Sequence, residues 1–503
     1  MNPLKKLAGE TGIYSIGILS RFLNYLLIPY YCRGNFVPEQ FGVYTEMYAY
    51  VAFLVVLLTY GLETAFFRFA SKKGAHPDKT FSTLLISICS TSLLFISLAI
   101  FFKEPISIWL KYPNHSEYVS WFAIIVGLDA ISSLFLARLR FHNKAKKFVG
   151  VNLANILVNI GFNILFISYF IQSEKLGYSS WIIEKFHIPG TGVGYIFIAN
   201  LIASIFKLSL LIPAIKFIRH GFNLQLWKNA LRYSLPLLVA GLAGMANETL
   251  DRILLKWVMW PLGEIYTMEQ LGIYGANYKM AILIALFLAA LRYAAEPFYF
   301  KYEKEPNAKQ VYAQVMKWVV IILCCMVLTV VLNIDVFRYF IGNEQDGYWQ
   351  GLGIVPIVMF AYVAFGIYQN NSIWFKLNEK TYYGILFTLL GAGITVVLNL
   401  WLIPKIEYWA SAWATLICYV SMAVCSIAVG QRQFYIPYEF GRIGLYLGMC
   451  ILLVLGSIQL NIGEYVNTFV YLLINCSVIL LFIFFILKTE KIGLLDLKSF
   501  LRS

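Results

Sequence analysis

Residues 51–73 read VAFLVVLLTYGLETAFFRFASKK. The first ten positions hold no charged residue, and the stretch then places Glu63 and Arg68 ahead of a basic end. A helix needs about 20 apolar residues to cross the hydrocarbon core of a bilayer, so this stretch and the residues before it predict a transmembrane helix. A carboxylate in such a helix usually faces water or a partner, which makes Glu63 a candidate functional residue.

The whole chain has the composition of a membrane protein. Of its 503 residues, 60% are hydrophobic and 13% are charged, with a mean hydropathy of +0.71, whereas a soluble domain carries about 25% charged residues. The first apolar run contains Arg21 and lacks a small-residue cleavage site, so we interpret it as a span and not as a signal peptide. The sequence predicts an all-α polytopic membrane protein with 14 transmembrane helices, centred near residues 21, 56, 91, 128, 160, 204, 247, 285, 322, 362, 393, 420, 450 and 477.

The net charge of +14 follows the predicted topology. With the N-terminus in the cytoplasm, the tails and the even-numbered loops hold twenty-three Lys and Arg residues, against seven in the odd-numbered loops. Cytoplasmic loops of membrane proteins carry such an excess, so both termini are predicted to be cytoplasmic. The topology therefore explains the excess of basic residues, and no nucleic-acid partner is expected.

Two halves of the chain resemble each other. The segment FGVYTEMYAY at residues 41–50 matches LGIYGANYKM at residues 271–280, with Gly42 and Gly272 in equivalent places. The offset corresponds to six spans, and both copies run in the same direction, as in parallel repeats of transporters. This predicts two six-helix bundles around a central cavity, plus two extra C-terminal helices.

The Glu63 segment has a near copy as well, RYAAEPFYFKYEK at residues 292–304, where Glu296 is again followed by aromatic and basic residues. The segment between the two halves mixes apolar and basic residues and is predicted to be a surface linker. The predicted domains are an N-terminal bundle at 1–217, an amphipathic linker at 218–232, a C-terminal bundle at 233–430, helices 13 and 14 at 431–487 and a cytoplasmic tail at 488–503.

Charged residues inside the predicted spans fall into two groups. Near span ends, where long side chains can reach the headgroups, lie Glu46, Arg68, Arg138 and Arg232. Deeper in the spans lie Arg21, Lys279, Arg292 and four residues of the segment NETLDRILLK, namely Glu248, Asp251, Arg252 and Lys256. The spacing of these four places them roughly on one helix face.

Two interpretations of the deeper charges stay open. They can be structural ion pairs, for which Asp251 with Arg252 and Arg292 with Glu296 are suitably spaced. Alternatively they line a hydrated central cavity with more cations than anions, which would attract an anionic substrate. Arginine suits phosphate because its planar fork donates two hydrogen bonds at once.

The sequence offers no catalytic or metal site. The five His residues lie in or near predicted loops, and the eight Cys residues lie in or beside spans without metal-ligand spacing. There is no glycine-rich phosphate loop. No catalytic residue, metal or cofactor is therefore expected, although coupling to an ion gradient or to the membrane potential stays open.

Two segments resemble a known family. GIYSIGILSRFLNYLLIPYYCRGNFVPEQFGVYTEMYAY at residues 12–50 and NLWLIPKIEYWASAWATL at residues 399–416 are similar to the polysaccharide-transport branch of the multidrug/oligosaccharidyl-lipid/polysaccharide exporter superfamily, which includes O-antigen-type and lipid II flippases. The resemblance implies alternating access in the bacterial inner membrane. Members that flip lipid II have fourteen spans and cavity arginines in helices one, two and eight. Arg21 and Arg292 match two of these, and Arg252 offers a third cation from span seven.

The resemblance implies a flippase that moves undecaprenyl-diphosphate-linked oligosaccharide to the external leaflet for surface polysaccharide synthesis. The implied partners are membrane lipids, the lipid-linked saccharide and polysaccharide polymerase or assembly proteins. The predicted substrate-binding residues are Arg21, Arg252, Arg292, Lys279, Asp251 and Glu248. The predicted gate and cavity residues are Glu63, Glu296, Arg68 and Asp129. The alternative to the gate is local pairing of Glu63 with Arg68 and of Glu296 with Lys301.

Two other functions stay open. A cation-coupled multidrug exporter of the same superfamily would use Asp129 or Asp251 as its coupling site, but Arg21 occupies the helix in which such exporters usually carry an acidic residue. A membrane enzyme would need a sizeable external loop with catalytic residues, and the sequence has none. The sequence does not identify the saccharide or the driving force.

Overall fold

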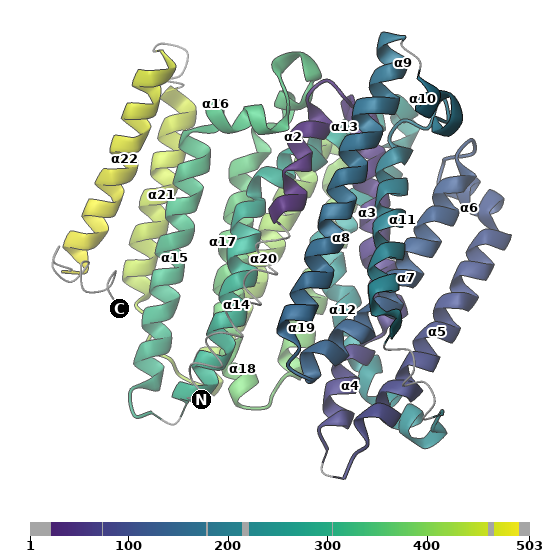
Figure 1. Ribbon diagram of the computed structural model, residues 1–503. Helices are drawn as coiled ribbons and strands as arrows, with labels where there is room; N and C mark the ends of the chain where they lie inside the picture. The colour runs from purple at the N-terminus through teal and green to yellow at the C-terminus, as the bar shows by residue number, and fades with distance from the viewer. Residues whose placement is uncertain are drawn as a thin grey trace. The chain divides into compact units, whose positions relative to one another are not determined.

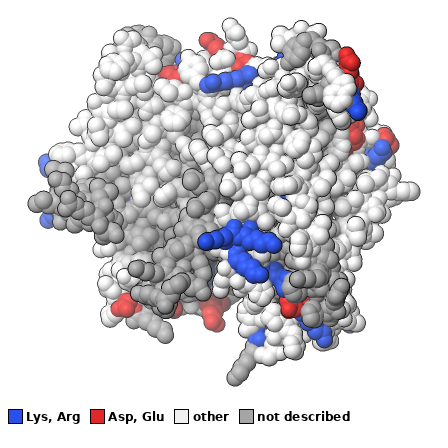
Figure 2. Space-filling model, in the orientation of Figure 1, with Lys and Arg blue, Asp and Glu red and all other residues white. Residues whose placement is uncertain are grey.

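The computed structural model describes residues 22–72, 74–177, 180–213, 221–303, 305–460 and 467–491. Within these ranges every regular element is a helix (Figure 1), which confirms the all-α prediction. Twelve helical segments are long and apolar enough to cross a membrane. In Figure 2 most of the visible described surface is uncharged, and the charged side chains form small clusters. The protein is therefore a multi-pass membrane protein.

The twelve segments correspond to twelve of the fourteen predicted spans. They are Pro38–Ala70, Pro77–Phe101, Ser116–Phe141, Ala145–Leu176, Gly194–Leu211, Glu264–Arg292, Ala308–Leu332, Ile354–Leu377, Tyr382–Ile406, Tyr408–Gln433, Phe440–Leu460 and Thr468–Thr489. The predicted span centred near residue 21 lies largely outside the described residues. The span centred near residue 247 lies within α12 (Leu224–Met259), a helix of 36 residues that carries the NETLDRILLK charges. This helix begins inside the stretch predicted as a linker, 218–232, and continues without interruption.

The helices pack into two compact units. The first holds the described residues up to Gly275 together with Ala392–Ser411. Within it, α5 packs along α7, α11 packs along α7 and α8, and α3 packs along α12. Its helices are α2 (Leu27–Cys32), α3 (Pro38–Thr59), α4 (Leu62–Ala70), α5 (Pro77–Phe101), α6 (Lys103–Trp109), α7 (Ser116–Phe141), α8 (Ala145–Phe166), α9 (Gln172–Leu176), α10 (Trp181–Phe186), α11 (Gly194–Leu211), α12 and most of α13 (Glu264–Tyr278).

The stretch that opens the sequence analysis is two helices and not one. Tyr60 and Gly61 adopt left-handed backbone conformations, with φ of 32° and 74°, and they separate α3 from α4. Glycine adopts this conformation at no steric cost. The break places Glu63 in the first turn of α4, where Phe66 packs edge-to-face against Phe81 of α5 with ring centroids 6.0 Å apart.

Helices α3 and α13 cross with their backbones in contact at the two repeat glycines. A methyl group added at Gly272 would lie 1.7 Å from the carbonyl oxygen of Pro38, and one added at Gly42 would lie 2.2 Å from that of Met268. Pro38 and Met268 are separated by the same number of residues as the two glycines. The two close contacts are therefore equivalent in the two repeats, so both positions require glycine for the same reason.

The second unit holds Ala276–Gly391 and the described residues from Ala412 onward. In it, α21 and α22 lie beside α15 (Figure 1). Its helices are the short 3-10 helix η4 (Lys279–Ala281), α14 (Ile282–Tyr302), α15 (Ala308–Leu332), α16 (Ile334–Phe337), α17 (Ile354–Asn371), α18 (Ile373–Leu377), the first part of α19 (Tyr382–Ile406), most of α20 (Tyr408–Gln433), α21 (Phe440–Leu460) and α22 (Thr468–Thr489).

A charged cluster attaches these two C-terminal helices to α15. Lys317 Nζ of α15 lies 2.6 Å from Glu490 Oε2, just beyond α22, and 2.8 Å from Glu439 Oε1, just before α21. Arg442 Nη1 and the Tyr446 hydroxyl also donate to Glu490, at 3.0 and 2.6 Å. Burial by itself raises the pKa of Glu490, but the hydrogen bonds from Lys317 and Tyr446 and the nearby positive charges outweigh it, so the pKa is lowered.

Candidate functional site

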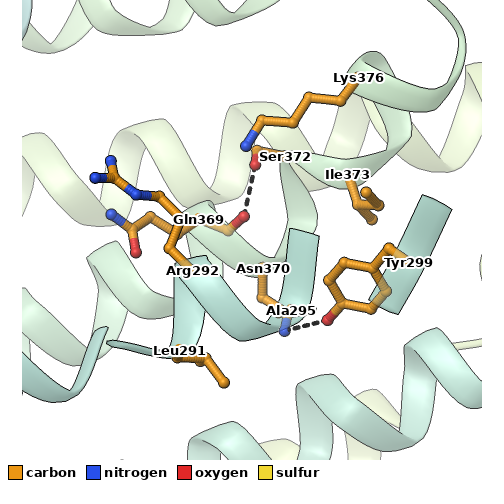
Figure 3. A pocket seen from close by; sticks show the side chains of 9 residues that line it. All are labelled: Leu291, Arg292, Ala295, Tyr299, Gln369, Asn370, Ser372, Ile373 and Lys376. Carbon is orange, nitrogen blue, oxygen red and sulfur yellow. Dashed lines mark hydrogen bonds between the residues drawn. The ribbon is translucent and has the colours of Figure 1, made fainter. Parts of the chain in front are cut away.

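A small cavity in the second unit has two cations and several polar residues among its lining residues, although most of the surface that it exposes is apolar (Figure 3). It lies between α14 on one side and the end of α17 with α18 on the other. The lining residues are Leu291, Arg292, Ala295, Tyr299, Gln369, Asn370, Ser372, Ile373 and Lys376. Of the predicted site residues whose side chains the structure describes, Arg292 is the one that lines this cavity.

The polar residues of the cavity come from a joint between two helices. Helix α17 ends at Asn371, and the backbone N–H of Ser372 donates to the carbonyl oxygen of Tyr368 at 2.9 Å. Helix α18 then begins, fixed by Trp374, which is fully buried and whose indole N–H donates to Ser426 Oγ at 3.4 Å. The joint therefore places Gln369, Asn370, Ser372 and Lys376 around the same cavity, whereas the Asn371 side chain bonds to Ser426 and Tyr438.

The electrostatics of the cavity favour an anion. Arg292 is exposed on α14 and Lys376 is half-buried in the last turn of α18, and no carboxylate is among the described lining residues. In Figure 3 the Arg292 side chain extends beside Gln369, and the Lys376 ammonium reaches toward Ser372. Arginine and lysine side chains are groups that bind phosphate oxygens.

A buried amide and a tyrosine form the far wall of the cavity. The Asn370 side-chain nitrogen donates to the Tyr299 hydroxyl at 2.7 Å, and the Tyr312 hydroxyl donates to the Tyr299 carbonyl oxygen at 3.0 Å. The ring centroids of Tyr299 and Tyr312 lie 5.0 Å apart, edge to face. These contacts connect α14, α15 and α17 and hold Asn370 in one orientation.

The first unit contains a fully buried ion pair that the sequence analysis missed. Lys256 Nζ of α12 lies 2.8 Å from Glu46 Oε2 of α3, and the two side chains are 1% and 0% exposed. Lys256 Nζ also donates to the carbonyl oxygen of Leu110 at 2.7 Å, and the Tyr112 hydroxyl donates to Glu46. The expectation that Glu46 reaches the headgroups from a span end is wrong, because Lys256, 210 residues away in the sequence, neutralises it inside the protein.

The other charged residues of α12 are arranged differently. Arg252 Nη1 lies 3.1 Å from Asp251 Oδ1, and the Tyr274 hydroxyl of α13 donates to the other Asp251 oxygen. Both charged residues are buried, whereas the Glu248 side chain is exposed and its carbonyl oxygen accepts from Arg252. The predicted ion pair of Asp251 with Arg252 is present, within one helix and held to α13 by Tyr274.

The predicted gate residue Glu63 has a different partner from the one expected. Arg140 Nη2 of α7 lies 2.8 Å from Glu63 Oε2, with side chains 33% and 36% exposed. Arg68 instead lies over the Tyr233 ring, 4.2 Å from its centroid. Local pairing of Glu63 with Arg68 is therefore wrong in this conformation, because Arg68 stacks on an aromatic ring of α12 and Arg140 reaches the carboxylate.

The remaining predicted residues are placed as follows. Asp129 Oδ1 of α7 lies 2.6 Å from Lys207 Nζ of α11 and accepts a 3.0 Å hydrogen bond from Ser204 Oγ. Lys279 lies half-buried in η4 and is not among the residues that line the cavity. Arg21 lies outside the described residues, and so does the side chain of Glu296 on α14.

Five polar residues of the cavity were not singled out from the sequence: Tyr299, Gln369, Asn370, Ser372 and Lys376. Lys376 belongs to a predicted cytoplasmic loop, where a lysine carries no signal of its own. The run QNNS at residues 369–372 is more informative, because it places four polar residues at the end of an otherwise apolar span. Polar residues at membrane depth face a cavity or the protein interior, so this run could have indicated the site.

The chain is similar in structure to known membrane transporters. It matches a structure described as "Lipid II flippase MurJ, inward closed conformation" with a TM-score of 0.73 at 14% identity, covering 95% of this chain and 99% of that one. It also matches an inward-facing multidrug resistance MATE family transporter of the MOP superfamily, with a TM-score of 0.57 at 14% identity over 83% of this chain and 94% of that one. For the MATE multidrug transporter DinF-BH the TM-score is 0.58 at 13% identity, over 86% and 97% of the two chains.

At these low sequence identities, the structural matches show a shared fold and nothing more specific. No curated protein sequence matches the chain. The sequence profile of the family described as "Polysaccharide biosynthesis protein" matches residues 8–303, more than half of the chain. The chain therefore belongs to the polysaccharide biosynthesis protein family, and its fold is that of the multidrug/oligosaccharidyl-lipid/polysaccharide exporter superfamily.

Proposed function

We propose that the protein is a flippase that moves an undecaprenyl-diphosphate-linked oligosaccharide from the cytoplasmic to the external leaflet of a bacterial inner membrane, by alternating access. The family supports a role in polysaccharide synthesis, and the lipid II flippase fold supports a lipid-linked substrate. The observation that carries the proposal is the cavity with Arg292 and Lys376, where no described lining residue is a carboxylate.

In this mechanism the chain's own cations bind the diphosphate. Arg292 donates two parallel hydrogen bonds to one phosphate, and Lys376 contributes a second positive charge from α18. By the predicted topology, both lie toward the cytoplasmic end of their helices, where the substrate is made. The polyprenyl tail stays in the lipid, along α21 and α22, while the sugars pass through the hydrated space. Arg21 and Lys279 are further candidate cations for the diphosphate, whereas Arg252 of the first unit is paired with Asp251 in this conformation.

In this proposal the membrane potential supplies the driving force, because the transported diphosphate is charged. Carrying one charge across the bilayer changes the free energy by about 2.3 kcal/mol per 100 mV of membrane potential.

Glu63 and Glu296 act as a gate in this proposal, pairing with nearby cations when the cytoplasmic side closes. Arg140 is the partner of Glu63 in the present conformation.

The test is the leaflet on which the lipid-linked saccharide accumulates. Cells depleted of the protein are restored with the wild type, with Arg292→Gln or with Lys380→Gln, and an external glycosidase or lectin reports exposed saccharide. Lys380 is a matched control, because it lies four residues beyond Lys376 and hydrogen bonds to Gln433 on the surface. We expect the saccharide to be exposed on the external leaflet only in cells restored with the wild type or with the Lys380→Gln control. Exposure in the depleted cells would contradict the flippase.

A cation-coupled multidrug exporter is the competing function, supported by the MATE-like fold. Such an exporter needs an acidic residue that can bind the coupling cation. Asp129 is neutralised by Lys207 at 2.6 Å, and Asp251 is neutralised by Arg252 and accepts a hydrogen bond from Tyr274. These contacts support the flippase over the exporter. Drug-stimulated ion flux in vesicles that contain the purified protein would reverse this preference.

A further inference from the structure

We infer that α8 of the first unit binds the sugar part of the lipid-linked substrate, through a row of asparagine side chains that follows this helix along the membrane. The asparagine row consists of Asn152, Asn155, Asn159 and Asn163. The inference rests on the proposed function, which assigns cations to the phosphate and leaves the contacts of the saccharide open.

The asparagine row lies on one face of α8. Its members are three or four residues apart, which places them one above the other on a helix. Every other residue between positions 148 and 166 is apolar, and none is charged. The exposed side chains of Leu157, Ile164 and Leu165 lie on the opposite side of the helix. The row is therefore on the side of α8 that is turned away from lipid, and α8 packs there among the helices of its unit, such as α11 and α7.

One end of the asparagine row is closed by a neighbouring helix. Asn163 is 1% exposed, and its oxygen accepts from the Tyr31 hydroxyl of α2 at 2.9 Å. Its nitrogen donates to the carbonyl oxygen of Asn159 at 2.9 Å and also to the Asn159 side-chain oxygen. By the predicted topology this is the external end of α8. Asn163 is therefore a structural residue, at which the accessible part of the row ends.

The other three asparagines are half-buried, and each keeps one accessible amide atom without a partner among the described residues. The Asn152 nitrogen donates to the Phe148 carbonyl oxygen at 2.9 Å, which leaves the Asn152 oxygen. The Asn159 oxygen accepts from Asn163, which leaves the Asn159 nitrogen. The Asn155 oxygen is buried, so its nitrogen is the accessible atom. Unpaired polar groups at membrane depth are costly, so these atoms are suited to a polar ligand.

The chemistry of these atoms indicates which part of the substrate they contact. They are one acceptor and two donors, and this stretch of α8 has no charge. A sugar hydroxyl both donates and accepts hydrogen bonds, whereas an ionised phosphate only accepts them and is bound best by cations. From Asn152 to Asn159 the helix rises about 10 Å, so the row can contact hydroxyls of more than one sugar ring. A neutral saccharide fits this surface better than a phosphate does.

The first experiment asks whether the asparagine row faces water and the saccharide. Asn155→Cys and Asn159→Cys are made in the full-length protein, reconstituted in nanodiscs and treated with a charged, water-soluble methanethiosulfonate reagent. Leu157→Cys is the matched control on the opposite face, and the wild type gives the background of the native cysteines. We expect the two row positions to react above background and Leu157→Cys not to react. The undecaprenyl-diphosphate-linked oligosaccharide that accumulates in depleted cells should slow both reactions, whereas bare undecaprenyl diphosphate should not.

The second experiment measures binding of the same two lipids by native mass spectrometry. The double variant Asn155→Leu/Asn159→Leu loses two hydrogen bonds to the saccharide, so its Kd for the oligosaccharide lipid should rise about tenfold or more. Its Kd for bare undecaprenyl diphosphate should stay unchanged, and Leu157→Ala should change neither value.

The outcomes separate the inference from the proposed function. No reaction at the row positions, equal protection by both lipids, or an unchanged Kd of the double variant for the oligosaccharide lipid would overturn the inference and leave the flippase standing. If depleted cells accumulate no lipid-linked oligosaccharide, or if the wild type does not bind it, the proposed function falls and the inference falls with it.

Discussion

Two charged regions of the molecule differ in how accessible their charges are. In the first unit, Lys256 and Glu46 neutralise each other with side chains 1% and 0% exposed. In the second unit, Arg292 and Lys376 line a cavity whose described lining residues include no carboxylate. A buried charge that is fully paired holds helices together, whereas cations gathered at a cavity can contact a ligand. The difference is one of access, because both regions lie among transmembrane helices.

Breaking the buried pair should give the largest effect on stability. Glu46→Gln or Lys256→Met leaves one charge buried without its counter-charge, which costs about 3–5 kcal/mol of unfolding free energy. The double variant Glu46→Leu/Lys256→Met removes both charges and should recover most of this loss, because an apolar pair of similar volume is often neutral. Unfolding of the purified protein in detergent, followed by circular dichroism, measures both. Additive losses in the double variant would contradict a structural pair.

Neutralising the cavity cations should affect binding and spare stability. Arg292→Gln or Lys376→Gln removes a charge-assisted hydrogen bond to phosphate, worth about 1.5–3 kcal/mol, so the Kd for undecaprenyl diphosphate should rise about 10-fold or more. The unfolding transition should stay within about 0.5 kcal/mol of the wild type. A large loss of stability with unchanged Kd would make these cations structural, like Lys256, and would erase the contrast between the two regions.

The glycine crossing tests whether α3 is positioned for the buried pair. Gly42 lies one turn before Glu46 on α3, and Gly272 faces Pro38 across the crossing. Gly272→Ala would push α3 away from α13, and we expect a loss of about 1–3 kcal/mol by overpacking. Gly244→Ala on α12 is the matched control, because a methyl group there has no neighbour within 4 Å. Equal stability of the two variants would show that the crossing can relax.

The sequence predicted the long-range architecture better than the individual contacts. Apolar runs predict helices because a span must satisfy its backbone internally, and the repeat of Gly42 at Gly272 reappears as the two equivalent contacts of the crossing. Pairing of neighbours was predictable where helical spacing decides it, as for Asp251 and Arg252. The partners of Glu46 and Glu63 lie 210 and 77 residues away, and the joint that brings Lys376 to the cavity that Arg292 also lines depends on tertiary packing. Neither local spacing nor periodicity carries that information.

The smallest effect on the unfolding free energy is expected at Glu63, because its charge is both paired and partly exposed to solvent. Its contact with Arg140 is 2.8 Å, but both side chains are about one-third exposed, and ion pairs with such exposure contribute about 0–1 kcal/mol. Glu63→Gln and Arg140→Gln should therefore leave the unfolding free energy almost unchanged and behave alike. If the pair closes the cytoplasmic side, each should slow transport while the Kd for the lipid persists, because neither residue lines the cavity. Unchanged transport rates in both variants would rule out the gate and assign the pair to the surface alone.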